Sequence, residues 1–397
     1  MGPIRSFDAS LLPSRVAGEV PVGEISATWL RQHLCQHHEL PDDLAGQWER
    51  DGTLRDRKVS FALLAAAEAW RASGCAAAQR EAWLSISLGM EQVFLEDLVP
   101  VLAGPTPDWS SETQVGLPRE RLRSRFDSAA EAVKQLLDLR GLMAVHASAC
   151  AGGALALAHA ASLVERGATP LVLAGGADSM INSMSLGGIS RLGAPSPRNE
   201  PDACRPFDRR RDGMVIGEGA AFFVVESEHH ARERGARPLA VVLGWGSSQD
   251  AYRLSAPRPD GAAARVAMER ALGRARLSPR EVAYVNAHGT GTLLNDVAEA
   301  RAIRAAFGAC ADTIPVSSIK GAVGHLMSAA GSVEAAACLL ALAGDVLPGT
   351  AHHRERDEEC ALDVIGETPR AVKADVVLSN SFGFGGQNCS IILGRHA

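Results

Sequence analysis

A single cysteine stands where an apolar strand is predicted to turn into a helix. Residues 145–149 lead into Cys150, and an alanine-rich helix is predicted over residues 151–166. A thiol at a helix start meets the positive end of the helix dipole and N–H groups without helical partners, which favour a thiolate. Gly152 and Gly153 leave room for a substrate to approach the backbone. The pattern indicates a nucleophile, and the alternative is a small buried thiol before a helix.

Three further motifs could do chemistry with this cysteine. His288 follows a predicted strand and stands in a loop of glycine and threonine, residues 286–292. Lys320 and His325 are five residues apart across two glycines, just before a second predicted helix. Residues 380–386, Asn-Ser-Phe-Gly-Phe-Gly-Gly, can present backbone N–H groups beside two aromatic rings. Each motif alone is weak, but their joint placement at strand ends and helix starts favours one functional site.

The elements that must position these residues alternate between apolar strands and helices, which predicts α/β layers. Each half has an alanine-rich helix, over residues 151–166 and 328–345, and each helix follows a reactive residue and precedes a buried strand. We therefore expect an internal duplication. Residues 1–237 would form the half that carries the cysteine, and residues 238–397 the half that carries the two histidines. Residues 180–198 are predicted to be a glycine- and serine-rich loop.

Composition narrows the class of protein. The chain has 397 residues, 46% of them hydrophobic, and a net charge of −6, which argues against nucleic-acid binding. Its eight cysteines form no CxxC pair, so we expect no metal site and a reducing, cytoplasmic setting. The longest apolar run, residues 329–343, is interrupted by Glu334, and we expect no membrane segment.

Taken together, the motifs resemble those of the β-ketoacyl-acyl-carrier-protein synthases, the elongating condensing enzymes with a Cys-His-His centre. The resemblance covers residues 6–394 and is strongest from Ala147 onward. Thiolases would carry a second catalytic cysteine, initiating synthases a Cys-His-Asn set, and chain-length factors no nucleophile. The resemblance implies a thiolase-like α/β fold of two duplicated α-β-α-β-α halves with mixed five-stranded sheets. It also implies a homodimer, or a heterodimer with another ketosynthase-like subunit.

The resemblance assigns roles to the reactive residues. Cys150 would carry the acyl chain as a thioester. His288 and His325 would bind the malonyl thioester carbonyl and stabilise the enolate formed when carbon dioxide leaves. Lys320 and Glu299 would form a buried charged pair that organises the histidines.

The remaining roles concern binding. Thr290 and Thr292 would contact the phosphopantetheine arm, which arrives on the acyl carrier protein, so no cofactor of the protein's own is expected. Phe382 would be the gate residue and would add its N–H to that of Cys150 in an oxyanion hole, with Phe384 as a second aromatic wall. The acidic carrier would dock on basic side chains, for which the candidates are Arg55, Arg57, Lys58 and Arg191. A solvated helix start is an equally good interpretation of these charges.

One feature departs from the family pattern. Family members have a strand, a glycine-rich turn and a helix before the segment that matches residues 7–10, and this sequence has only six residues there. Three interpretations are open: the natural start lies upstream of Met1, the first sheet lacks its first strand, which would be at a central position, or another segment fills that place. The function expected first is decarboxylating condensation of an acyl chain with malonyl-acyl carrier protein, in fatty-acid or polyketide synthesis. A non-catalytic partner subunit is the alternative, and a cysteine hydrolase is a poor third.

Overall fold

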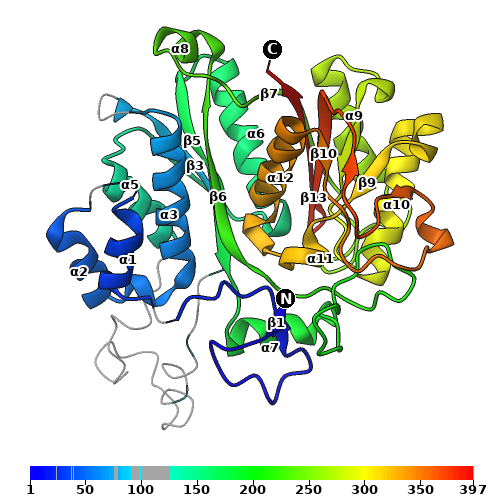
Figure 1. The fold of residues 1–397 in the computed structure, drawn as a ribbon, viewed down its shortest axis with the longest axis horizontal. Coiled ribbons are helices and arrows are strands. Elements are labelled where there is room, and N and C mark those ends of the chain that lie inside the picture. The colour runs from blue at the N-terminus through cyan, green and yellow to red at the C-terminus, as the bar shows by residue number, and fades with distance from the viewer. Residues whose placement is uncertain are drawn as a thin grey trace.

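The computed structural model describes residues 1–396 except residues 24, 37, 39, 76–78, 91–93, 95–98 and 100–125. In this part of the chain two β-sheets stand side by side, with helices α6 (Gly152–Glu165) and α12 (Ala330–Gly344) between them (Figure 1). The outer faces carry the helices α3 (Arg57–Ala72), α5 (Ser128–Leu137), α9 (Ala262–Ala275) and α10 (Leu293–Phe307). These α-β-α-β-α layers confirm the predicted fold class, but the sheets have four and six strands among the described residues instead of the predicted five each.

The first sheet has four strands in the order β4-β3-β5-β6 among the described residues. Strand β3 is parallel to β4 and β5, whereas β6 is antiparallel to β5. Every residue of β5 is buried, as its continuous apolar sequence predicts for a strand covered on both faces. The strands are β3 (Trp83–Leu88), β4 (Met143–His146), β5 (Leu171–Ser179) and β6 (Glu218–Glu226).

The second sheet repeats this order and adds two strands, β11-β9-β8-β13-β14-β7. Strand β7 pairs antiparallel with β14 and lies at the edge of the sheet. The matching place in the first sheet is therefore beside β6, and the prediction that the missing strand would be central is wrong. The bounds are β7 (Ala240–Gln249), β8 (Tyr284–Asn286), β9 (Pro315–Ser317), β11 (Asp363–Val364), β13 (Val376–Gly383) and β14 (Gln387–Arg395).

Shorter elements complete the described part of the chain. Two-residue strands pair as β1 with β2 and as β10 with β12. The other elements are β1 (Gly2–Pro3), β2 (Val16–Ala17), α1 (Ala27–Leu34), α2 (Asp42–Arg50), η1 (Thr53–Arg55), η3 (Ala149–Ala151), α7 (Ser183–Arg191), α8 (Glu228–Glu233), η4 (Pro279–Glu281), η5 (Gly308–Asp312), α11 (Lys320–Val323), η6 (Met327–Ala329), β10 (Val346–Leu347), η7 (Glu358–Cys360) and β12 (Arg370–Ala371).

The two central helices cross at a pair of glycines. A Cβ atom at Gly153 would lie 2.6 Å from the backbone nitrogen of Ser332, and one at Gly331 would lie 2.5 Å from that of Ala154. Only glycine permits this approach, which brings the starts of both helices to one point. Residues 327–344 are long and apolar enough to span a membrane by composition, but most of this segment is buried between the sheets as a core helix.

Candidate active site

Cys150 lies in the turn between β4 and α6. Its predecessor Ala149 has a φ of 44°, in the left-handed region, so the chain bends sharply just before the thiol. Cys150 is 3% exposed and packs in an apolar cluster with residues of the link between β5 and α7, of α7 itself, of the segment before β6 and of η6. The side chains in this cluster include Met180, Ile181, Leu186, Ile189, Met214, Ile216 and Met327. An alkyl chain attached to the sulfur would meet an apolar lining.

Burial raises the pKa of the Cys150 thiol to about 12, against the opposing effects of the Lys320 charge and the Phe384 backbone N–H. The expectation of a thiolate favoured by the helix start is therefore corrected. Desolvation of the charged form outweighs the groups that stabilise a thiolate in this buried site. The resting nucleophile is a protonated thiol, which must lose its proton as it reacts.

The rate of alkylation of Cys150 by iodoacetamide should accordingly rise about tenfold per pH unit from about pH 7 to pH 9. Both active-site histidines are neutral over this range, so they add no inflection. Mass spectrometry of the peptide that contains Cys150 measures the rate at each pH. A plateau above pH 7 would show that the thiolate is already formed at neutrality.

The turn after β13 supplies a backbone donor to the sulfur. The N–H of Phe384 is hydrogen-bonded to Cys150, and a Cβ atom at Gly383 would lie 3.2 Å from the backbone nitrogen of Cys150. The Phe382 side chain instead points to the histidines, with its ring centroid 5.7 Å from that of His288. The amide beside the thiol therefore belongs to Phe384, and the assignment of this role to Phe382 is wrong. The N–H groups of Cys150 and Phe384 can together bind an oxyanion.

Lys320 fixes the orientation of His288. The Nζ atom lies 3.3 Å from the Nδ1 atom of His288 and donates to the Glu334 carboxylate. A lysine ammonium can only donate, so Nδ1 of His288 accepts and the ring proton is on Nε2. Lys320 and Glu334 are both about 1% exposed, and burial with the Lys320 charge lowers the pKa of His288 well below its usual value.

His325 is held by the backbone on both sides. Its N–H donates to the Val215 carbonyl at 2.7 Å, and its carbonyl accepts from Gly217 at 2.9 Å. The N–H of Met327 donates to Nδ1 of His325 at 3.2 Å, which again leaves the ring proton on Nε2. Burial lowers the pKa of His325 well below its usual value. The rings of His288 and His325 are 5.3 Å apart at 80°, so the site holds two neutral imidazole donors side by side.

Glu299 does not pair with Lys320, contrary to the expectation. Its carboxylate accepts from the N–H groups of His288 and Gly289, at 2.8 and 2.7 Å, and from Asn380 at 3.2 Å. Burial raises the pKa of Glu299 to about 7. Its role is to hold the loop that carries His288, whereas the partner of Lys320 is Glu334. A lone acid in an apolar helix was the signal for Glu334, because a buried charge requires a partner.

The two threonines lie at the start of α10. Their hydroxyl oxygens are 2.9 Å apart, Thr290 is buried, and Thr292 caps the helix. The buried Asp296 accepts from the N–H groups of Thr290 and Gly291 at 3.0 and 3.2 Å. Asp296 and its neighbour Arg211, 3.8 Å away, were not predicted from the sequence.

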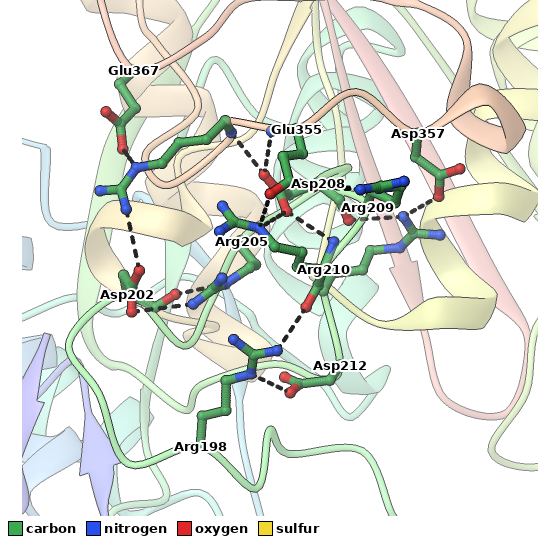
Figure 2. A network of polar contacts seen from close by, with 12 residues as sticks. Arg198, Asp202, Arg205, Asp208, Arg209, Arg210, Asp212, Glu355, Asp357 and Glu367 are labelled. Atoms are coloured by element: carbon green, nitrogen blue, oxygen red, sulfur yellow. Dashed lines mark hydrogen bonds and ion pairs between the residues drawn. The ribbon is translucent and has the colours of Figure 1, made fainter.

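A larger network of charges lies next to this loop. Figure 2 shows arginines of residues 198–211 pointing toward carboxylates that include Asp357 and Glu355. Asp208 lies among them and accepts from the N–H groups of Arg354 and Glu355, both at 2.7 Å. Its pKa is lowered to about 2 by hydrogen bonds from these N–H groups and from Arg210, which outweigh the effect of burial. The network fixes residues 204–213 against residues 352–358 and thereby supports the threonine loop.

Residues 13–231 match the model of the β-ketoacyl synthase N-terminal domain, and residues 239–354 match that of the C-terminal domain. The chain belongs to the β-ketoacyl synthase family. Among curated relatives, this β-ketoacyl synthase is 36% identical to an oxytetracycline polyketide β-ketoacyl synthase 1 of Streptomyces rimosus, over 98% of this chain and 89% of the relative. It is 33% identical to a 3-oxoacyl-[acyl-carrier-protein] synthase 2 of Coxiella burnetii, over 99% and 91%.

A solved structure of a type II polyketide ketosynthase, in complex with its acyl-carrier protein and bound to a hexaketide, superposes on this β-ketoacyl synthase with a TM-score of 0.83. The two are 25% identical, and the match covers 99% of this chain and 92% of the other. The similarity in sequence and in structure therefore extends over the whole chain.

Two of the predicted docking residues bind other groups within this β-ketoacyl synthase: Lys58 is buried, and Arg57 is half-buried. Lys58 is 2% exposed, pairs with Asp56 at 2.9 Å and donates to the Met90 carbonyl. Arg57 is bound to both carboxylate oxygens of Glu218. Their role is to fix the start of α3, so the prediction of carrier contacts is corrected for both. Arg55 and Arg191 are exposed and stay candidates.

Proposed function

We propose that the protein is an acyltransferase that joins an acyl chain on Cys150 to a malonyl unit on an acyl carrier protein, with loss of carbon dioxide. The product is a β-ketoacyl-acyl carrier protein. The observation that carries the proposal is the pair of neutral imidazoles, His288 and His325, both protonated on Nε2 in a buried site. Neutral donors can stabilise an enolate without protonating it permanently.

In the first half-reaction the sulfur of Cys150 attacks the thioester carbonyl of an acyl-carrier protein. The carbonyl oxygen becomes an oxyanion, bound by the N–H groups of Cys150 and Phe384. Collapse expels the phosphopantetheine thiolate, which takes up the proton that the cysteine loses. The acyl chain then occupies the apolar cluster around the thiol.

In the second half-reaction the malonyl thioester carbonyl accepts hydrogen bonds from Nε2 of His288 and of His325. Cleavage of the bond to the carboxylate releases carbon dioxide and leaves an enolate, whose carbon attacks the acyl thioester of Cys150. The new carbon–carbon bond forms as the thiolate of Cys150 leaves, and the thiolate then takes up one proton from solvent. Loss of one such donor typically costs about 10²–10³ in rate.

The same proposal extends to the carrier protein, the oligomeric state and the cellular compartment. The phosphopantetheine arm of the carrier enters past Thr290 and Thr292, and the protein needs no cofactor of its own. We propose a homodimer, because β4 pairs only with β3 among the described strands and its residues are half-buried, leaving an edge for a second copy. The cysteines within the described residues are all unpaired, which fits a reducing cytoplasm.

Reconstitution tests this function. The purified protein is incubated with an acyl-carrier protein and malonyl-carrier protein, and the carrier is analysed by intact mass. A β-ketoacyl carrier supports the proposal. Inactivity that is relieved only by a second ketosynthase-like subunit would support the partner-subunit alternative, and release of free acid alone would support a hydrolase.

Docking of the acidic carrier should depend on Arg55 and Arg191. Replacing both with glutamate should raise the KM for malonyl-carrier protein about three- to tenfold and weaken its salt dependence, because surface charges steer association. The KM for malonyl-pantetheine, which lacks the carrier, should not change. Arg166→Glu is the matched control, because Arg166 is exposed at the end of α6 remote from Cys150. An unchanged KM for the carrier substrate would remove both residues from the docking surface.

A further inference from the structure

The two halves contain the same sharp turn before their central helix. Turn η3 leads directly into α6, and turn η6 leads directly into α12. The first residue of each turn has nearly the same left-handed backbone, with φ of 44° at Ala149 and 47° at Met327. The second residue is Cys150 in one half and Ser328 in the other. Ser328 is therefore the structural counterpart of the nucleophile.

The two turns differ in what faces the N–H of that second residue. In the first half it is Gly383, at the end of β13, whose missing side chain leaves the N–H of Cys150 free for an oxyanion. In the second half it is Asp178, near the end of β5, whose Oδ2 accepts from the N–H of Ser328 at 2.8 Å. A carboxylate thus occupies the place in the second turn that an oxyanion would take in the first.

The turn that Asp178 holds is the one that orients His325. The N–H of Met327 donates to Nδ1 of His325, and the next N–H along the chain, that of Ser328, donates to Asp178. The hydroxyl of Ser328 reaches the carbonyl of Ala149 at 3.4 Å, so the same turn touches the one that carries the nucleophile. Displacement of Met327 would remove the bond that keeps the proton of His325 on Nε2.

Burial raises the pKa of Asp178 to about 7, against the opposing effects of the Ser328 N–H, the Lys58 charge and the Ser179 N–H. Asp178 is 1% exposed, and its Oδ1 has no hydrogen-bond partner among the described residues. A Cβ atom at Gly89 would lie 2.1 Å from Oδ1, so glycine is required there to admit the carboxylate. A buried acid with one unpaired oxygen is costly, and its negative charge raises the pKa of Cys150. Neither effect helps acyl transfer.

We infer that Asp178 is a positioning residue for the decarboxylation half-reaction, acting through the N–H of Ser328 to hold the turn that sets the tautomer and direction of His325. The inference rests on the proposed function, because it assumes the role assigned to His325. Asp178 contacts no substrate in this account and is distinct from the charged pair of Lys320 and Glu334 behind His288.

The test compares Asp178→Ala, which removes the acceptor, with Asp178→Asn, which keeps an oxygen at the same place. We expect Asp178→Ala to lower kcat for carbon dioxide release from malonyl-carrier protein about 10- to 100-fold with little change in KM. Alkylation of Cys150 should not slow, because a negative charge near the thiol is removed. Asp178→Asn should restore most of the decarboxylation rate. Asp178→Ser, whose hydroxyl is too short to reach Ser328, replaces the alanine variant if that variant does not fold.

A spectroscopic measurement separates positioning from general destabilisation. The ¹⁵N ring signals of His325, identified by their loss in His325→Asn, should report a proton on Nε2 in the parent and in Asp178→Asn. They should report a mixture of tautomers in Asp178→Ala. A folded Asp178→Ala or Asp178→Ser variant with the parental tautomer and the parental decarboxylation rate would overturn the inference. Absence of carbon dioxide release by the parent itself would instead reject the proposed function.

Discussion

Replacing Cys150 with alanine is expected to abolish acyl-enzyme formation and condensation altogether. Cys150 is the thiol at the turn before α6, and its N–H and that of Phe384 are the donors placed for an oxyanion at this sulfur. Without a nucleophile the acyl chain has no point of covalent attachment. The yield of the acyl-enzyme adduct should therefore fall below the detection limit. Intact mass of the protein after incubation with acyl-carrier protein measures the adduct.

Cys389→Ala is the matched control for this variant. Cys389 is likewise buried, but it lies in β14, and its side chain belongs to the core cluster between the sheets. This variant should acylate as the parent does. The Cys150→Ala protein should still release carbon dioxide from malonyl-carrier protein, because the histidines are untouched. An acyl adduct of parental yield on Cys150→Ala would reject the assignment of the nucleophile.

Replacing His325 with alanine is expected to produce the reverse pattern. The enolate forms on the malonyl side, where Nε2 of His325 and of His288 are the donors. Carbon dioxide release should fall about 10²–10³-fold, which is the usual cost of losing one such donor. Acylation of Cys150 should continue at a substantial rate, because the oxyanion hole for that step consists of backbone N–H groups.

His229→Ala controls for loss of a histidine elsewhere. Its side chain is 83% exposed on α8, and this variant should retain both half-reactions. Acyl-enzyme mass and carbon dioxide are measured in parallel for each protein. If His325→Ala decarboxylated malonyl-carrier protein at the parental rate, the two-histidine mechanism would be wrong and residues 324–325 would be only the structural start of a turn.

Strongly patterned elements were predictable from the sequence. The helix predicted over residues 151–166 is α6, Gly152–Glu165, and the buried strand predicted from residue 170 is β5, Leu171–Ser179. The helix α7, Ser183–Arg191, was instead predicted as loop, because Gly187 and Gly188 lower its intrinsic propensity. Its Asn182 cap and packed Leu186 and Ile189 outweigh that penalty in the folded protein.

The sequence predicted which residues belong to the active site better than it predicted which of them contact one another. Glu299 and Glu334 both lie on helices near His288, and only the packing of α10 and α12 decides which acid reaches Lys320. The same holds for Phe382 and Phe384, two residues apart in one turn, where the geometry of β13 decides which amide faces the sulfur. The periodicity of apolar residues along the chain does not determine which of two nearby residues makes a given contact in the folded protein.

A chase of the acyl-enzyme tests the central claim most directly. The protein is first loaded with an acyl chain from its carrier, freed of excess carrier, and then mixed with malonyl-carrier protein while intact masses are followed in time. The account predicts that the adduct on Cys150 disappears at the rate at which β-ketoacyl-carrier protein appears, one molecule for one. Disappearance of the adduct as free acid, or an adduct that persists while carbon dioxide is released, would contradict it.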